Sequence, residues 1–210
     1  MLGPEPAWKL YVSPEVQGRE RAGEVVAETL RRLGHPGVFA RLSAAGVADW
    51  SLVALDLAAG AARLKLYERL VSVDAEGLAA RLAVGWPGGM DVVMPFLEIL
   101  SDGWTDRPEW LVLVYTVADD GCSRIAFHVP LPPTTPRLAL VGRVGRALER
   151  FGLDAGAWGR VAAAADLHPS YVSCQAEGDG TRITAYLALR AYEARYGLQH
   201  RPVWPSPVRG

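Results

Sequence analysis

Cysteine, net charge and long apolar runs are all scarce in this sequence, and each scarcity excludes a class of protein. With 2 cysteines among 210 residues, a disulfide-stapled domain is not expected, and a reducing cytoplasm is the expected location. A formal net charge of −1 lacks the basic excess that non-specific binding to nucleic acid or an anionic membrane requires. No run approaches the roughly 18 apolar residues of a membrane span. We therefore expect a soluble domain without nucleic-acid or membrane partners.

Motifs for metals, nucleotides and activated nucleophiles are also missing. Cys122 and Cys174 lack the partner spacing of a metal or redox site. No D-D-x-x-D metal–diphosphate motif, dinucleotide fingerprint or Ser-His-Asp constellation can be placed. We therefore expect that no metal site and no cofactor is required, with Mg²⁺ an optional addition.

What the sequence does contain is a recurring order of strand pairs and helices. Seven strands are predicted, over residues 7–13, 50–58, 62–70, 109–117, 122–131, 170–177 and 181–189. Helices are predicted over residues 14–34, 74–84, 91–101, 137–152 and 155–165. We interpret residues 1–199 as one domain and residues 200–210 as a proline-rich tail.

The strands carry an internal repeat with a period of about sixty residues. Tyr11, Tyr67, His128 and Tyr186 fall at corresponding strand positions, separated by 56, 61 and 58 residues. Because strand side chains alternate between faces, Arg63, Lys65 and Tyr67 share one face, opposite the leucines between them. Helices packed on the apolar face would leave the polar face inside. The sequence therefore predicts an α+β fold, an antiparallel β-barrel or partial barrel with helices outside and a polar lumen.

Cations from separate strands would repel one another in this lumen unless it receives a polyanion. Guanidinium and ammonium groups suit phosphate oxygens, and phenol rings stabilise a cation that develops beside the anion. A prenyl diphosphate has both features. The candidate diphosphate ligands are Lys9, Arg63, Lys65, Arg124 and Arg182, the candidate cation shield is Tyr11, Tyr67, Tyr171 and Tyr186, and the candidate catalytic residues are Tyr67, Tyr186, His128 and Asp56.

These stretches resemble the aromatic prenyltransferases of the ABBA type, and within them the indole, or dimethylallyltryptophan synthase, branch. The likeness rests on KLY at 9–11, RLKLY at 63–67, YVSCQ at 171–175 and RITAY at 182–186. It implies repeated α-β-β-α units, diphosphate bound by Lys9, Arg63 and Lys65, a tyrosine shield, and no obligatory metal. The implied reaction moves a prenyl group of five or ten carbons from its diphosphate to an electron-rich aromatic acceptor such as an indole, in a small molecule or a peptide.

Two departures from the family pattern leave alternatives open. Ala126 and His128 stand where the third strand usually carries a polar residue and a tyrosine. The resemblance covers about three and a half of the family's five units, so the acid that anchors the indole N–H is unassigned. A homodimer or a partner subunit could complete the barrel, or it could close with fewer strands. The alternatives to transfer are a non-catalytic homologue that binds diphosphate or a partner chain, and a cyclase.

Three carboxylate positions have simpler explanations. Asp56 could contact an acceptor, but pairing with an arginine is the preferred interpretation. Glu68 is expected to be exposed at the end of its strand. Asp119 and Asp120 belong to a predicted hairpin turn, where carboxylates are common.

Overall fold

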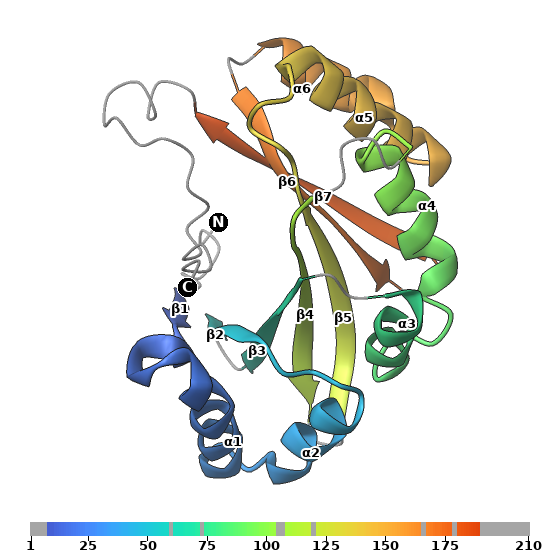
Figure 1. Cartoon of the computed structure of the whole chain (residues 1–210). Helices are drawn as coiled ribbons and strands as arrows, with labels where there is room; N and C mark the ends of the chain where they lie inside the picture. Colours follow the sequence, from blue (N-terminus) through green and yellow to red (C-terminus); the bar gives the residue numbers. More distant parts are fainter. Residues whose placement is uncertain are drawn as a thin grey trace.

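The computed structural model describes residues 8–58, 61–71, 74–103, 108–118, 121–164, 167–177 and 180–189 (Figure 1). The predicted tail at 200–210 and the predicted turn residues Asp119 and Asp120 lie outside the described residues.

One curled antiparallel sheet organises the molecule. Its 7 strands follow one another in chain order, and each is antiparallel to the next. They are β1 (Trp8–Val12), β2 (Trp50–Ala58), β3 (Ala61–Leu70), β4 (Leu111–Ala118), β5 (Gly121–Pro130), β6 (Leu167–Glu177) and β7 (Gly180–Leu189). The sheet forms a half-barrel (Figure 1), which confirms the predicted partial barrel. Within the described residues, β1 and β7 are edge strands without a further neighbour.

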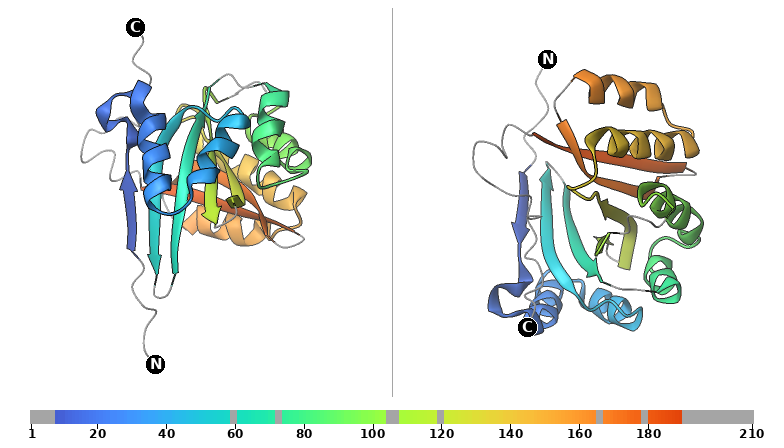
Figure 2. Two further views of the ribbon diagram at one scale, coloured as in Figure 1. Left: turned by 90° about the horizontal axis from the view of Figure 1, so that it is seen from below. Right: turned by 45° about the horizontal axis from the view of Figure 1, so that its top comes forward.

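Helices cover the outer, convex side of the sheet (Figures 1 and 2). They are the short 3₁₀ helices η1 (Pro14–Gln17) and η2 (Arg19–Arg21), and the α-helices α1 (Ala22–Arg32), α2 (Pro36–Ala44), α3 (Ala75–Ala83), α4 (Met90–Leu100), α5 (Arg137–Arg150) and α6 (Ala155–Ala164). Among the helices of the described residues, none has the length and apolar character to cross a membrane.

The first helical region differs from the single predicted helix over 14–34. Gly18 has a φ of 104°, which a helix does not tolerate, so two 3₁₀ turns precede the start of α1 at Ala22. Gly34 ends that helix with a φ of 86°, as the sequence predicted, and Pro36 opens α2, which the sequence did not predict.

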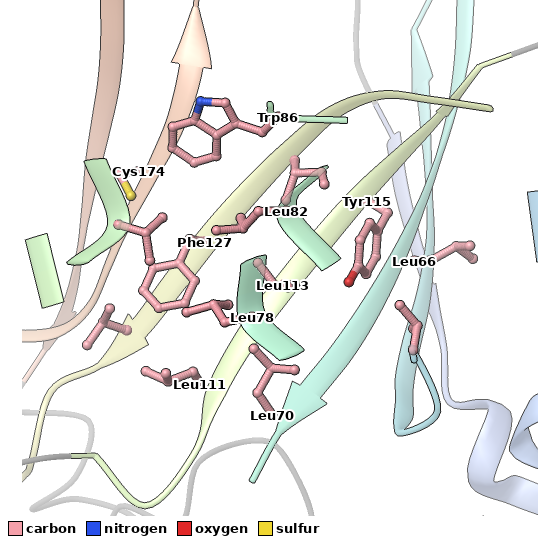
Figure 3. Close-up of a cluster of buried hydrophobic side chains, with 14 of the residues drawn as sticks. Leu66, Leu70, Leu78, Leu82, Trp86, Leu111, Leu113, Tyr115, Phe127 and Cys174 are labelled. Atoms are coloured by element: carbon pink, nitrogen blue, oxygen red, sulfur yellow. The ribbon is translucent and has the colours of Figure 1, made fainter. Parts of the chain in front are cut away.

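The hydrophobic core fills the space between the convex face and the helices (Figure 3). Leu66, Leu113 and Phe127 from three adjacent strands are fully buried there, against α3 residues such as Leu82. Each such side chain contributes about 1.5–3 kcal/mol of stability by leaving water. Side chains alternate between the two faces along each strand, so the residues on either side of Leu66, Leu113 and Phe127 in the sequence face the concave side.

Glu68 is buried in this core, so the expected exposure was wrong. Its side chain accepts hydrogen bonds from the Tyr115 hydroxyl at 2.7 Å and from Arg81 Nε at 2.8 Å. Strand alternation turns Glu68 to the face of Leu66, and α3 brings Arg81 over that face. Burial raises the pKa of the Glu68 carboxyl, and the two hydrogen bonds oppose that rise.

Candidate functional site

The polar face of the half-barrel is assembled by strand register. Lys9 of β1 lies opposite Asp56 of β2, and Asp56 lies opposite Arg63 of β3. One position further along the strands, on the same face, Lys65 lies opposite Thr116, which lies opposite Arg124. Paired residues in an antiparallel sheet share a face. The predicted cations of β1, β3 and β5 therefore share one face, with Asp56 of β2 and Thr116 of β4 between them.

The odd-numbered strands arrange this face into three bands. The aromatic band is Tyr11, Tyr67, His128 and Tyr186, the lysine pair is Lys9 and Lys65, and the arginine band is Arg63, Arg124 and Arg182. The register shows that each band advances by two residues from one odd strand to the next. The strands of a curled sheet are tilted relative to its axis. Residues at the same height on successive odd strands are therefore offset in the hydrogen-bond register, here by two residues. The bands therefore follow the curvature of the half-barrel.

Curling brings distant strands together at the aromatic band. β3 and β7 are four strands apart in the sheet order, which is about 19 Å in a flat sheet. Burial raises the pKa of the Tyr67 phenol, and Tyr11, Asp56 and Tyr186 raise it further. Tyr67 and Tyr186 belong to the same band of the concave face, on β3 and β7.

His128 takes the third place in the aromatic band. Its ring lies 5.8 Å from the Tyr186 ring, centroid to centroid. Burial lowers the pKa of the His128 imidazole from 6.5 to about 4, and Lys65 contributes to the lowering. At neutral pH the ring is therefore uncharged, so it does not repel a cation at this position.

Tyr171 extends the aromatic band on β6. It lies opposite Tyr186 in the register, and its ring centroid is 6.1 Å from that of Trp110. The sequence assigned Tyr171 to the candidate cation shield. Their contact places the Trp110 indole beside the shield.

Asp56 pairs with lysines rather than with an arginine, which corrects the sequence-based interpretation. Lys65 Nζ lies 2.7 Å from Asp56 Oδ2, and Lys9 Nζ lies 3.9 Å from Asp56 Oδ1. The register places Lys9 and Arg63 directly opposite Asp56, and Lys65 reaches the carboxylate diagonally from two residues further along β3. The Arg63 side chain is exposed. Of the strand carboxylates with described side chains, Asp56 faces the cations and Glu68 faces the helices.

The arginine band remains open to a ligand. Within the described residues, Arg63 and Arg124 have no ion-pair partner, and Arg63 and Arg182 are exposed. Arg69, by contrast, is buried and bound by Glu15 at 2.7 Å and Asp49 at 3.3 Å. Arg69 follows Tyr67 by two residues, but its charge is already matched. It is therefore a structural cation at the end of the face.

Gln175 is a candidate ligand that the sequence did not identify. It lies on β6 between Ala126 of β5 and Arg182 of β7 in the register. Its amide thus stands next to the position where Ala126 replaces a polar residue. The two-residue alternation of Tyr171, Ser173 and Gln175 in YVSCQ was the available signal.

Metal binding has no dedicated site in the described part of the chain. No group of three or more His, Cys, Asp or Glu side chains lies close enough there to hold an ion.

Comparison with known proteins supplies the family context. No family model and no curated protein matches the sequence, but solved structures do. The 5-dimethylallyltryptophan synthase of Streptomyces coelicolor matches with a TM-score of 0.76 and 27% identity, over 89% of this chain and 58% of that chain. The 6-dimethylallyltryptophan synthase of Micromonospora olivasterospora, solved in complex with DMASPP and Trp, matches with a TM-score of 0.77 and 27% identity, over 90% and 60% of the two chains.

The chain has the fold of the ABBA aromatic prenyltransferases. AnaPT from Neosartorya fischeri shares the fold alone, with 15% identity and a TM-score of 0.66, over 86% of this chain and 52% of that chain. The ABBA fold explains the helices outside and the polar face inside. The chain spans less than two thirds of the length of these solved structures.

Proposed function

We propose that the concave face binds a prenyl diphosphate and transfers its prenyl group, of five or ten carbons, to an electron-rich aromatic ring such as an indole. The observation that carries the proposal is the order of the bands. A row of cations lies directly beside a row of aromatic rings on one curled face. The anionic head and the cationic carbon of an ionising donor need these two environments side by side.

The cations lower the cost of breaking the bond between the prenyl carbon and oxygen. Lys9, Arg63 and Lys65 hold the diphosphate, and Arg124 and Arg182 reach it from the opposite half of the sheet. The leaving diphosphate takes the electron pair of the broken bond, and charges fixed in place stabilise it as it forms. Arginine binds phosphate oxygens with its fork of donors, and lysine supplies a point charge.

The aromatic band protects the allyl cation. Adjacent bands are two residues apart along a strand, which corresponds to about 6.7 Å. When the phosphates lie at the lysine pair, the prenyl carbons therefore lie against Tyr11, Tyr67 and Tyr186. Their ring faces stabilise the cation and exclude water that would capture it.

The aromatic acceptor completes the reaction. A ring carbon forms the new carbon–carbon bond, and the ring then loses a proton and recovers its aromatic electrons. The neutral imidazole of His128 lies in the aromatic band and is the proton acceptor that we assign. Structures of the neighbouring synthases in complex with DMASPP and Trp support this choice of donor and acceptor classes.

A second candidate is binding of diphosphate without transfer. The exposed β1 edge favours it, because Trp8 is 71% exposed and Leu10 is 55% exposed. An acceptor site that needs further strands would be incomplete in these 210 residues. A homodimer or a partner subunit that completes the barrel remains a prediction.

Calorimetric titration with dimethylallyl and geranyl thiolodiphosphates tests the donor site. Lys65→Ala and Arg63→Ala should each weaken binding by about 1.5–3 kcal/mol, because each loses a charged hydrogen bond. Arg160→Ala is the matched control, since this arginine lies on α6 and is 75% exposed. Unchanged affinity in both site variants would mean that the cations are only a solvated face.

Turnover separates the two candidates. With dimethylallyl diphosphate as donor, a transferase releases diphosphate only when tryptophan or another indole is added. A protein that binds without transfer gives the calorimetric signal and no such release.

A further inference from the structure

Asp56 is an anion inside a site that is otherwise built for an anion. Its side chain is 21% exposed and that of its partner Lys65 is 26% exposed, so the pair is largely shielded from water. The register surrounds Asp56 with Lys9 on one side and Arg63 on the other. Three of the proposed diphosphate ligands therefore lie around one carboxylate.

The two oxygens of this carboxylate are in different situations. Oδ2 contacts Lys65 at 2.7 Å. Oδ1 is buried, has no hydrogen-bond partner among the described residues, and lies 3.9 Å from Lys9. A buried carboxylate oxygen without a donor is unfavourable. Only one of the two carboxylate oxygens therefore has a close partner. Such a weakly held ion pair allows Lys65 to exchange Asp56 for a ligand.

We propose that Asp56 is a built-in counter-ion that holds Lys65 in the empty site and yields it to the substrate diphosphate. This inference rests on the proposed function, since it concerns the same anion site. A phosphate oxygen that reaches Lys65 comes close to the Asp56 carboxylate, and the two negative charges repel each other. Asp56 therefore weakens the hold of the site on any anion and speeds the departure of the diphosphate product.

The same exchange makes the site selective for polyanions. A small anion such as inorganic phosphate gains little, because at Lys65 it only replaces the charge of Asp56. A diphosphate is long enough to bind Lys65 and also Arg63 or Arg124, which have no ion-pair partner among the described residues. Asp56 thus prevents tight binding of inorganic phosphate but allows tight binding of diphosphate.

A purely positioning role for Asp56 predicts the opposite sign. If the carboxylate only fixes the Lys65 side chain for the ligand, its removal disorders the ammonium group and weakens binding. If it is a competing counter-ion, its removal frees Lys65 and strengthens binding. The direction of the affinity change therefore decides between the two roles.

The test is calorimetric titration of the 210-residue protein with inorganic diphosphate and with inorganic phosphate. Asp56→Asn removes the charge and keeps the shape, and Asp56→Ser is a second variant if the first folds poorly. Glu149→Gln on α5 removes the same charge from an exposed site in the outer layer. We expect Asp56→Asn to bind diphosphate at least about tenfold more tightly than wild type, to bind phosphate measurably, and Glu149→Gln to match wild type.

Three further results are informative. Equal or weaker diphosphate binding by both Asp56 variants, with a wild type that binds, overturns the counter-ion role and leaves the proposed function standing. Absence of binding in wild type and variants alike overturns the proposed function and this inference with it. At low salt, Asp56→Asn should also unfold at a lower temperature than the Glu149→Gln control and regain the difference when diphosphate is added. An unchanged unfolding temperature contradicts the counter-ion role.

Discussion

Acid should destabilise this protein partly through one residue, His128. The imidazole lies half-buried beside Tyr186, and its withdrawal from water lowers its pKa from 6.5 to about 4 in the folded chain. In the unfolded chain the ring has its ordinary pKa. At a pH between these two pKa values, the His128 ring is protonated in the unfolded state and neutral in the folded state. The free energy of unfolding therefore falls as the pH falls. The contribution is fully present above pH 6.5 and is lost on acidification.

The size of the effect follows from the two pKa values. The free-energy difference that His128 contributes between pH 7 and pH 5 is about 2 kcal/mol, and it approaches about 3 kcal/mol at pH 4. Carboxylates that ionise differently in the two states add to acid sensitivity, but they are the same in wild type and in a His128 variant. The difference between the two proteins therefore isolates the histidine.

Urea unfolding at pH 7, 6, 5 and 4.5 is the appropriate assay. His128→Phe and His128→Tyr remove the titrating group, and the tyrosine restores the aromatic residue found at the other positions of the band. Wild type should lose about 2 kcal/mol more than either variant between pH 7 and pH 5. Equal losses in all three proteins would show that the folded protein accepts the proton at its ordinary pKa, and the neutral aromatic band would be refuted.

Two other variants test the core and the open edge. Tyr115→Phe removes the 2.7 Å hydrogen bond to Glu68 and should cost about 1.5–3 kcal/mol in urea unfolding, because a buried carboxylate loses a donor; a loss below about 0.5 kcal/mol would contradict the buried network. Leu10→Lys should change stability by less than about 0.5 kcal/mol, because Leu10 is 55% exposed on β1. A larger loss, or a change of mass in solution, would show that another chain covers this edge.

Period-two alternation made most of the fold predictable. Leu64 and Leu66 point to the helices, Arg63 and Lys65 point to the concave side, and the sixty-residue spacing of the aromatic positions marks the odd strands correctly. These features depend only on neighbours along the chain and on a repeat that the chain displays. The half-barrel and its outer helices follow from them.

Contacts between elements were not predictable in the same way. Alternation assigns Glu68 to the apolar face, but the buried position is stable only because Arg81 and Tyr115 reach it from other elements. Likewise, Asp56 contacts Lys65 at 2.7 Å although the register places Arg63 directly opposite it. A single sequence shows which residues are available for such a network, but it does not show which of them come close together in the fold.

The repeat of cation and aromatic residue differs between the two halves of the sheet. The aromatic residue follows the nearest cation by two residues on β1 and β3, but by four on β5 and β7, where Ala126 and Thr184 fill the place of the lysines.

Both ammonium groups therefore lie on the β1–β3 half, together with Arg63. Among these side chains, the β5–β7 half carries the guanidinium groups of Arg124 and Arg182. Asp56 offsets one of the three cations on the first half through its contact with Lys65. On the proposed function, a diphosphate that contacts both Lys65 and Arg124, which lie on either side of Thr116 in the register, spans the curve of the sheet and places its prenyl group beside the aromatic band.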